Sequence, residues 1–104
     1  PGYGLGLYST SKAALSMLTK NQAKEWGKHG IRVNAICPGL IQTKFSSALW
    51  NNDNIMKQIN KKLPLARMGQ SDEIASVALM LASEAGSYIT GSLVVADGGF
   101  LISG

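Results

Sequence analysis

The chain has 104 residues, of which 45% are hydrophobic and 15% are charged, and its formal net charge is +4. This length suits one domain or a piece of one, and the composition excludes an acidic disordered chain and a coiled coil. No apolar run approaches the roughly 18 residues that a membrane span needs. We therefore expect a cytoplasmic protein without a membrane partner. Because the sequence starts at Pro1 rather than Met, we also expect that an N-terminal part is missing.

The ten basic residues are spread along the chain, which favours solvated helix faces over a nucleic-acid site. Cys37 is the only cysteine in the sequence, so an internal disulfide and a cysteine-based metal site are excluded. His29 stands alone near a predicted helix end. We expect neither a nucleic-acid partner nor a bound metal.

The first predicted elements are a helix and a strand. Apolar residues follow helical spacing over residues 8–27, and the Gly-rich segment 2–6 is interpreted as the loop into this helix. Residues 31–37 alternate in the manner of a strand, which the turn at Pro38 and Gly39 ends.

The second half of the chain predicts two helices and a second strand. Residues 40–51 are expected to form an extended loop, followed by a short amphipathic helix over 55–63. Ser71 is the expected N-cap of a buried helix over 72–83. Residues 93–96 form a short apolar strand of the kind that parallel sheets bury.

Two apolar strands joined through helices predict a parallel crossover in an α/β sheet with helices on its faces. Such sheets usually hold more than two strands, and we expect the others to precede Pro1. The predicted fold class is therefore α/β, the C-terminal part of a doubly wound, parallel-sheet, Rossmann-like fold. Residues 1–104 would be one fragment of a single domain.

Tyr8 and Lys12 lie four residues apart and therefore share a face of the predicted helix, with Cβ atoms about 5–6 Å apart. This spacing alone decides little. The sequence around the pair and four later parts of the chain give it a context. These five segments are YSTSKAAL (8–15), RVNAICPG (32–39), LIQT (40–43), GQSDEIA (69–75), and YITG with VVADGG (88–91 and 94–99). In this order they resemble parts of the short-chain dehydrogenase/reductase family. The parts are its catalytic helix, the next strand with its Pro-Gly turn, the loop over the nicotinamide, the start of the last long helix, and the last strand with its turn.

The resemblance implies hydride transfer between NAD or NADP and a ketone, an aldehyde or a secondary alcohol. It implies that Tyr8 exchanges a proton with the substrate and that Lys12 binds the hydroxyls of the nicotinamide ribose. A tyrosine titrates near 10, too high for an efficient base near neutrality. A cation about 5.5 Å away, at an effective dielectric of ~20, is worth roughly 3 kcal/mol or about two pKa units, which Lys12 is placed to supply.

The resemblance also implies a cofactor loop. Pro38 and Gly39 lie where the carboxyl edge of the sheet is expected, the edge at which open α/β sheets bind ligands. By resemblance, the backbone of Ile41 meets the nicotinamide amide, and the hydroxyl of Thr43 meets the amide or the pyrophosphate.

Residues 44–63 are interpreted as a substrate loop. Phe45, Leu49 and Trp50 either line an apolar substrate pocket or simply pack the loop. The partners implied are a small carbonyl or alcohol substrate and other copies of the chain in a homotetramer. Within this family, the sequence most resembles carbonyl and retinal reductases.

Two other functions stay open. One is a 3-oxoacyl-[acyl-carrier-protein] reductase, in which Lys57, Lys61 and Lys62 would meet an acidic carrier. The other is a non-catalytic fragment that serves only in packing or assembly. The Gly-rich pyrophosphate cradle and the family's catalytic serine and asparagine are expected before Pro1, so residues 1–104 alone are expected to be inactive.

Overall fold

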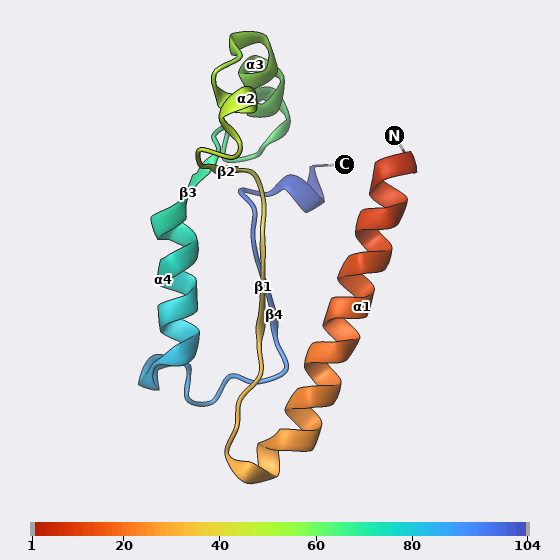
Figure 1. Cartoon of the computed structure of the whole chain (residues 1–104), viewed down its shortest axis with the longest axis vertical. Coiled ribbons are helices and arrows are strands. Elements are labelled where there is room, and N and C mark those ends of the chain that lie inside the picture. Colours follow the sequence, from red (N-terminus) through yellow and green to blue (C-terminus); the bar gives the residue numbers. More distant parts are fainter. Residues whose placement is uncertain (1, 104) are drawn as a thin grey trace.

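The computed structural model describes residues 2–103, and their side chains from Ser9 onward. It is an open arrangement of helices around a pair of parallel strands (Figure 1). The elements, in chain order, are α1 (Gly2–Trp26), β1 (Ala35–Pro38), β2 (Ile41–Gln42), α2 (Ser47–Trp50), α3 (Asp53–Lys62), β3 (Gly69–Gln70), α4 (Ser71–Ala82) and β4 (Leu93–Ala96), with short 3-10 turns at Gly27–His29, Glu84–Gly86 and Phe100–Ile102.

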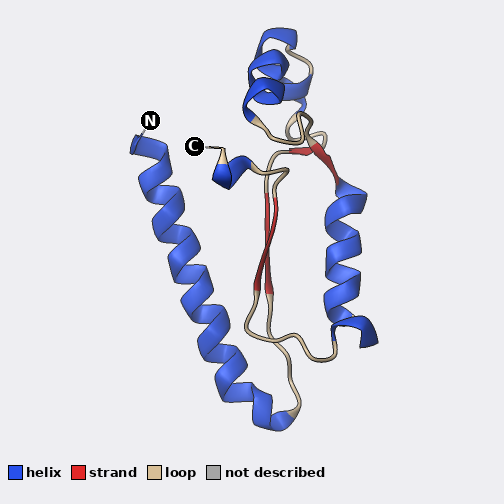
Figure 2. Ribbon diagram, turned by 180° about the vertical axis from the view of Figure 1, so that it is seen from behind, coloured by secondary structure: helices blue, strands red, loops and turns tan. Residues whose placement is uncertain are grey.

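The strands β1 and β4 pair in parallel, with Ala35 opposite Leu93 and Pro38 opposite Ala96. α1 lies on one side of this pair and α4 on the other, as both ribbon views show (Figures 1 and 2). The helices α2 and α3 form a separate lobe beyond the carboxyl end of β1 (Figure 1). The parallel crossover that the sequence predicts is confirmed.

The first strand is shorter than the predicted 31–37, because side chains replace part of the main-chain pairing before Ala35. The Val33 N–H donates to the hydroxyl of Thr90 (3.0 Å). The Asn34 side chain donates to the carbonyl of Ile89 and accepts from the N–H of Ser92, each at 3.0 Å. Regular pairing therefore starts only at Ala35.

The prediction of a loop over residues 2–6 is wrong, since α1 begins at Gly2. Extending an existing helix needs no new nucleus, and each glycine costs only about 1 kcal/mol relative to alanine. The segment has no proline after Pro1 that would end the helix.

The prediction of an extended loop over residues 40–51 is also wrong. Residues 41 and 42 form β2, which pairs in parallel with β3, and α2 follows at Ser47–Trp50. The next helix begins earlier than the predicted residue 55, because the Asn52 side chain caps it by accepting from the Ile55 N–H (3.1 Å).

Few side chains are buried among the described residues: Thr19, Ala23, Leu63, Met68 and Leu81. On α4, the predicted buried face is only partly covered, with Leu81 buried and Ile74 and Val77 half-buried. Several large apolar side chains of the helices are exposed, including Leu18 at 54% and Leu79 at 70%. No helix in the described part of the chain combines the length and apolarity that crossing a membrane requires.

Gly39 allows the ends of β1 and β4 to approach each other closely. Its N–H donates to the carbonyl of Ala96 (3.1 Å). A Cβ atom on Gly39 would lie 2.6 Å from the Cβ of Asp97 and 2.7 Å from its Cα. The close contact involves backbone, so it cannot be relieved by turning a side chain.

We predict that Gly39→Ala lowers the free energy of unfolding of the whole protein by about 1–3 kcal/mol, because the strand ends must separate. Gly27→Ala is the matched control, since a Cβ atom there meets nothing within 4 Å, and it should be neutral or stabilising by about 0.4–1 kcal/mol. Urea unfolding of both variants measures the difference, and equal stabilities would contradict the close approach.

Candidate active site

The carboxyl edge of the parallel pair gathers the segments that follow both strands. After β1 the chain runs through Gly39 into β2, and after β4 it turns at Asp97. The Asp97 carboxylate accepts the N–H of Gly99 (2.8 Å) with one oxygen and the N–H of Leu101 (3.0 Å) with the other. Gly99 has φ +94°, a left-handed conformation that favours glycine. This edge is where open α/β sheets bind their ligands.

The segment Ile41–Thr43 is fixed by side chains that follow it. The Ser46 hydroxyl donates to the carbonyl of Ile41 (2.7 Å) and accepts from the N–H of Thr43 (2.9 Å). The indole N–H of Trp50 donates to the carbonyl of Thr43 (2.8 Å). One hydroxyl and one indole therefore restrain the backbone of this short segment.

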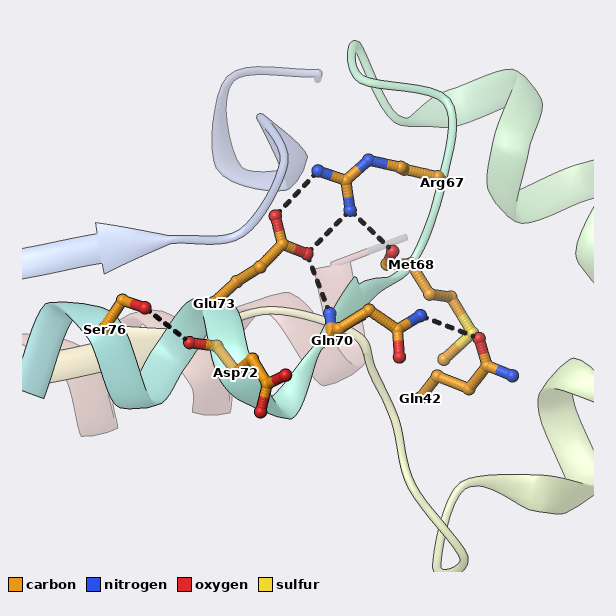
Figure 3. Close-up of polar contacts among 7 residues, drawn as sticks. All are labelled: Gln42, Arg67, Met68, Gln70, Asp72, Glu73 and Ser76. Carbon is orange, nitrogen blue, oxygen red and sulfur yellow. Dashed lines mark hydrogen bonds and ion pairs between the residues drawn. The ribbon is translucent and has the colours of Figure 1, made fainter.

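The same segment is bound on its other side by β3. The Gly69 N–H donates to the carbonyl of Leu40 (2.9 Å). The side-chain amide of Gln70 donates to that of Gln42 (3.0 Å; Figure 3). A Cβ atom on Gly69 would lie 2.8 Å from the Ile41 side chain, so β2 and β3 are closely packed.

An ion pair fixes the junction between β3 and α4. Two guanidinium nitrogens of Arg67 donate to the two carboxylate oxygens of Glu73, each at 2.8 Å (Figure 3). The Gln70 N–H also donates to Glu73 (2.9 Å). The hydrogen bond from Arg67, followed by that from the Gln70 N–H, lowers the pKa of Glu73 from 4.5 to about 2. The pairing with Glu73 also raises the pKa of Arg67.

The cap of α4 differs from the prediction. Gln70 rather than Ser71 is the N-cap, and Ser71 is the first residue of the helix. The reason is that Glu73, at the third helical position, accepts from the backbone of Gln70, as in a capping box. The sequence Gln70-x-x-Glu73 was a signal for this arrangement.

A cavity of about 550 Å³ opens at this edge, on the side of α4. Its walls are mostly apolar, and three charged side chains reach it: Arg67, Glu73 and Asp97. Each of the three is already engaged, in the ion pair or in the turn after β4. A smaller cavity of about 180 Å³ lies between α3 and Phe100.

The predicted catalytic pair lies on α1. Tyr8 belongs to this helix, but its side chain is outside the part that the structure describes. Lys12 follows one turn later and is half-buried. The N-terminal end of α1 lies at the same end of the molecule as the carboxyl ends of β1 and β4 (Figures 1 and 2).

The other predicted site residues separate into two groups. Gly39, Ile41 and Thr43 are half-buried and lie together along the edge, directly after the exposed Pro38. In the predicted substrate loop, Leu49 and Trp50 are half-buried, whereas Phe45 is fully exposed at 102%.

Sequence reasoning missed the polar residues that support this segment: Gln42, Ser46, Arg67, Gln70 and Glu73. Ser46 lies three residues after Thr43, a spacing at which a hydroxyl often bonds nearby backbone. The Gln42–Gln70 contact joins residues 28 apart, so no local pattern announces it.

Comparisons with known proteins identify the family. Residues 1–101 match the family model described as "Enoyl-(Acyl carrier protein) reductase". The chain is 48% identical over 99 residues to dehydrogenase/reductase SDR family member 4 of Oryctolagus cuniculus, an alignment that covers 95% of this chain and 38% of that protein. It is 36% identical over 101 residues to a tropinone reductase homolog of Arabidopsis thaliana, covering 97% and 38%. The chain belongs to the short-chain dehydrogenase/reductase family.

Solved structures share the fold. A 4-hydroxyisoleucine dehydrogenase complexed with NADH matches with a TM-score of 0.84 and 40% identity, over 91% of this chain and 39% of that one. A gluconate 5-dehydrogenase from Burkholderia cenocepacia, in complex with NADP and tartrate, matches with a TM-score of 0.79 and 34% identity, over 91% and 37%. The predicted α/β, Rossmann-like fold class is confirmed. The chain spans about two fifths of the length of these relatives.

We predict that the stability advantage of the wild type over Glu73→Gln depends on pH. Above pH 4.5 the carboxylate is charged in the folded and the unfolded chain, and the ion pair contributes fully. As the pH falls from 4.5 to about 2, the unfolded chain binds a proton that the folded chain resists, and the contribution disappears. Urea unfolding at several pH values should show the advantage shrinking across this window.

Asp72→Asn is the control, because it removes a carboxylate from the same helical turn without touching the ion pair. An advantage of the wild type over Glu73→Gln that stays constant from pH 5 to pH 2 would contradict the assignment.

Proposed function

We propose that the whole protein is an NAD(P)-dependent oxidoreductase that moves a hydride between the nicotinamide and a ketone, an aldehyde or a secondary alcohol. The observation that carries the proposal is the position of the Tyr8–Lys12 helix. The N-terminal end of this helix lies at the same end of the molecule as the carboxyl ends of β1 and β4, and Ile41–Thr43 follows β1 (Figure 1). Family membership and the NADH or NADP bound in related structures support the same conclusion.

The residues present fit a nicotinamide carboxamide. This group offers two donors and one acceptor, and the main chain of Ile41 and the hydroxyl of Thr43 offer polar groups of both kinds. The dinucleotide, when bound, supplies the hydride. Pro38 and Gly39 would place the backbone at the carboxyl edge of the sheet, where the nicotinamide would bind.

Tyr8 would exchange the proton with the substrate oxygen. Lys12, one helical turn away, would hold the ribose hydroxyls and favour the ionised phenol by its charge. Phe45 and Leu49 would line the substrate pocket, together with the ring of Trp50. The exposure of Phe45 in this chain leaves its ring open to such contact.

A second candidate is a 3-oxoacyl-[acyl-carrier-protein] reductase. The observation that favours it is the exposure of Lys57, Lys61 and Lys62 on α3, where an acidic carrier would find complementary charge. Comparing turnover of acyl-carrier and free ketone substrates separates the two candidates. A non-catalytic packing role, the third possibility, predicts no turnover with either.

We propose a homotetramer as the assembled state, with the faces of α1 and α4 as the contacts between copies. Leu18 and Leu79 are exposed on these helices, and Tyr88 is fully exposed after α4. Sedimentation velocity of the whole protein at micromolar concentration should give a tetramer. A monomer under these conditions would refute the assignment of these faces.

We predict that Tyr8→Phe in the whole protein lowers turnover by roughly a hundredfold or more, because the proton donor is lost. Dinucleotide affinity should stay within about twofold, since the ring remains. Steady-state kinetics with NADH and NADPH, together with a binding titration, measure both quantities. Near-normal turnover in the purified variant would contradict the role of Tyr8 as proton donor.

A further inference from the structure

We propose that Trp50 and Ser46 are positioning residues for the dinucleotide. They hold the backbone of Ile41–Thr43 in the conformation that receives the nicotinamide carboxamide. This inference rests on the proposed function, and it gives Trp50 a role beyond any contact that its ring makes with substrate.

The contact made by Trp50 is specific in geometry. Its indole nitrogen can only donate, and in this structure it donates to the main-chain carbonyl of Thr43 at 2.8 Å. Trp50 is the last residue of α2, which begins directly after Ser46. The short helix α2 therefore places the indole N–H of Trp50 beside the segment that precedes the helix.

Ser46 binds the same segment through several hydrogen bonds. Its hydroxyl donates to the carbonyl of Ile41 at 2.7 Å and accepts from the N–H of Thr43 at 2.9 Å. The Ser46 N–H in turn donates to the hydroxyl oxygen of Thr43 at 3.3 Å. The two hydroxyl oxygens also lie 3.4 Å apart, so the Thr43 side chain is itself held against Ser46.

The bonds matter because the strand β2 ends at Gln42, which leaves Thr43 in the connection to α2. Ordering a flexible backbone when a ligand binds costs conformational entropy, which reduces affinity. On the β3 side, Ile41 and Gln42 are already held by strand pairing and by the Gln42–Gln70 contact. Trp50 and Ser46 complete the restraint at Thr43, where the strand pairing has ended.

The test compares Trp50→Phe with Trp26→Phe in the whole protein. Both variants exchange the same residue types, but Trp26 ends α1 at the opposite end of the molecule from the α2–α3 lobe (Figure 1). The dissociation constants of NADH and NADPH are measured by fluorescence titration, and the KM values of dinucleotide and carbonyl substrate by steady-state kinetics. Thermal midpoints establish that each variant is folded.

For Trp50→Phe we expect dinucleotide affinity to fall roughly threefold to tenfold, the effect of losing about one hydrogen bond. The KM of the carbonyl substrate should change less than about twofold, because the aromatic ring remains. Trp26→Phe should leave both constants unchanged.

Ser46→Ala provides a second and independent variant. It should weaken dinucleotide binding to a similar extent, whereas Ser46→Thr, which keeps the hydroxyl, should retain affinity within about twofold. Because both residues hold one segment, the double variant Ser46→Ala, Trp50→Phe should lose less than the product of the single effects.

Three results overturn the proposal. One is a folded Trp50→Phe variant with wild-type dinucleotide affinity. Another is a rise confined to the KM of the carbonyl substrate, which would assign Trp50 to the substrate pocket alone. The third is a wild-type protein that binds no dinucleotide, which would overturn the proposed function as well and is thereby distinguished from the first two.

Discussion

The parallel pairing of β1 with β4 is the interaction on which the rest of this structure depends. It joins residues nearly sixty positions apart and brings the carboxyl ends of both strands to one edge. The closest approach is at Gly39, where the backbone leaves no room for a side chain against Asp97. Ile41 and Thr43, which are proposed to meet the nicotinamide carboxamide, lie in the segment that follows this edge. A disturbance there would therefore move the segment Ile41–Thr43 even though no proposed catalytic side chain is altered.

Beyond that edge, short-range polar contacts replace hydrophobic packing as the main source of order. The segment at Ile41–Thr43 is held by strand pairing on one side and by Ser46 and Trp50 on the other. The Arg67–Glu73 pair is solvent-exposed, so its worth lies in joining β3 to α4 with good bidentate geometry rather than in a large stabilisation. A few directional bonds thus join the α2–α3 lobe to the edge formed by β1 and β4.

The sequence predicted those features that repeat with a short period or match a family motif. Residues 93–96 form the strand expected from their apolar run. The family that the five segments together indicated is confirmed by the match over residues 1–101. The start of β1 was misplaced because apolar alternation continues upstream, while the hydrogen bonds pass to Asn34 and Thr90. Those partners lie 55 or more residues away from the groups they bind, and no local pattern reveals them. The contact from Trp50 was missed for a different reason: the residue type suggested an apolar wall, and only the folded geometry gives its N–H a partner.

The central claim is that the segment after β1 receives the nicotinamide. Hydrogen–deuterium exchange of the whole protein, with and without saturating NADH or NADPH, tests it most directly. The account predicts that bound dinucleotide slows amide exchange in residues 39–46, while residues 27–31, at the far end of α1, exchange at an unchanged rate. Saturating dinucleotide that leaves the exchange of residues 39–46 unaltered would contradict the account.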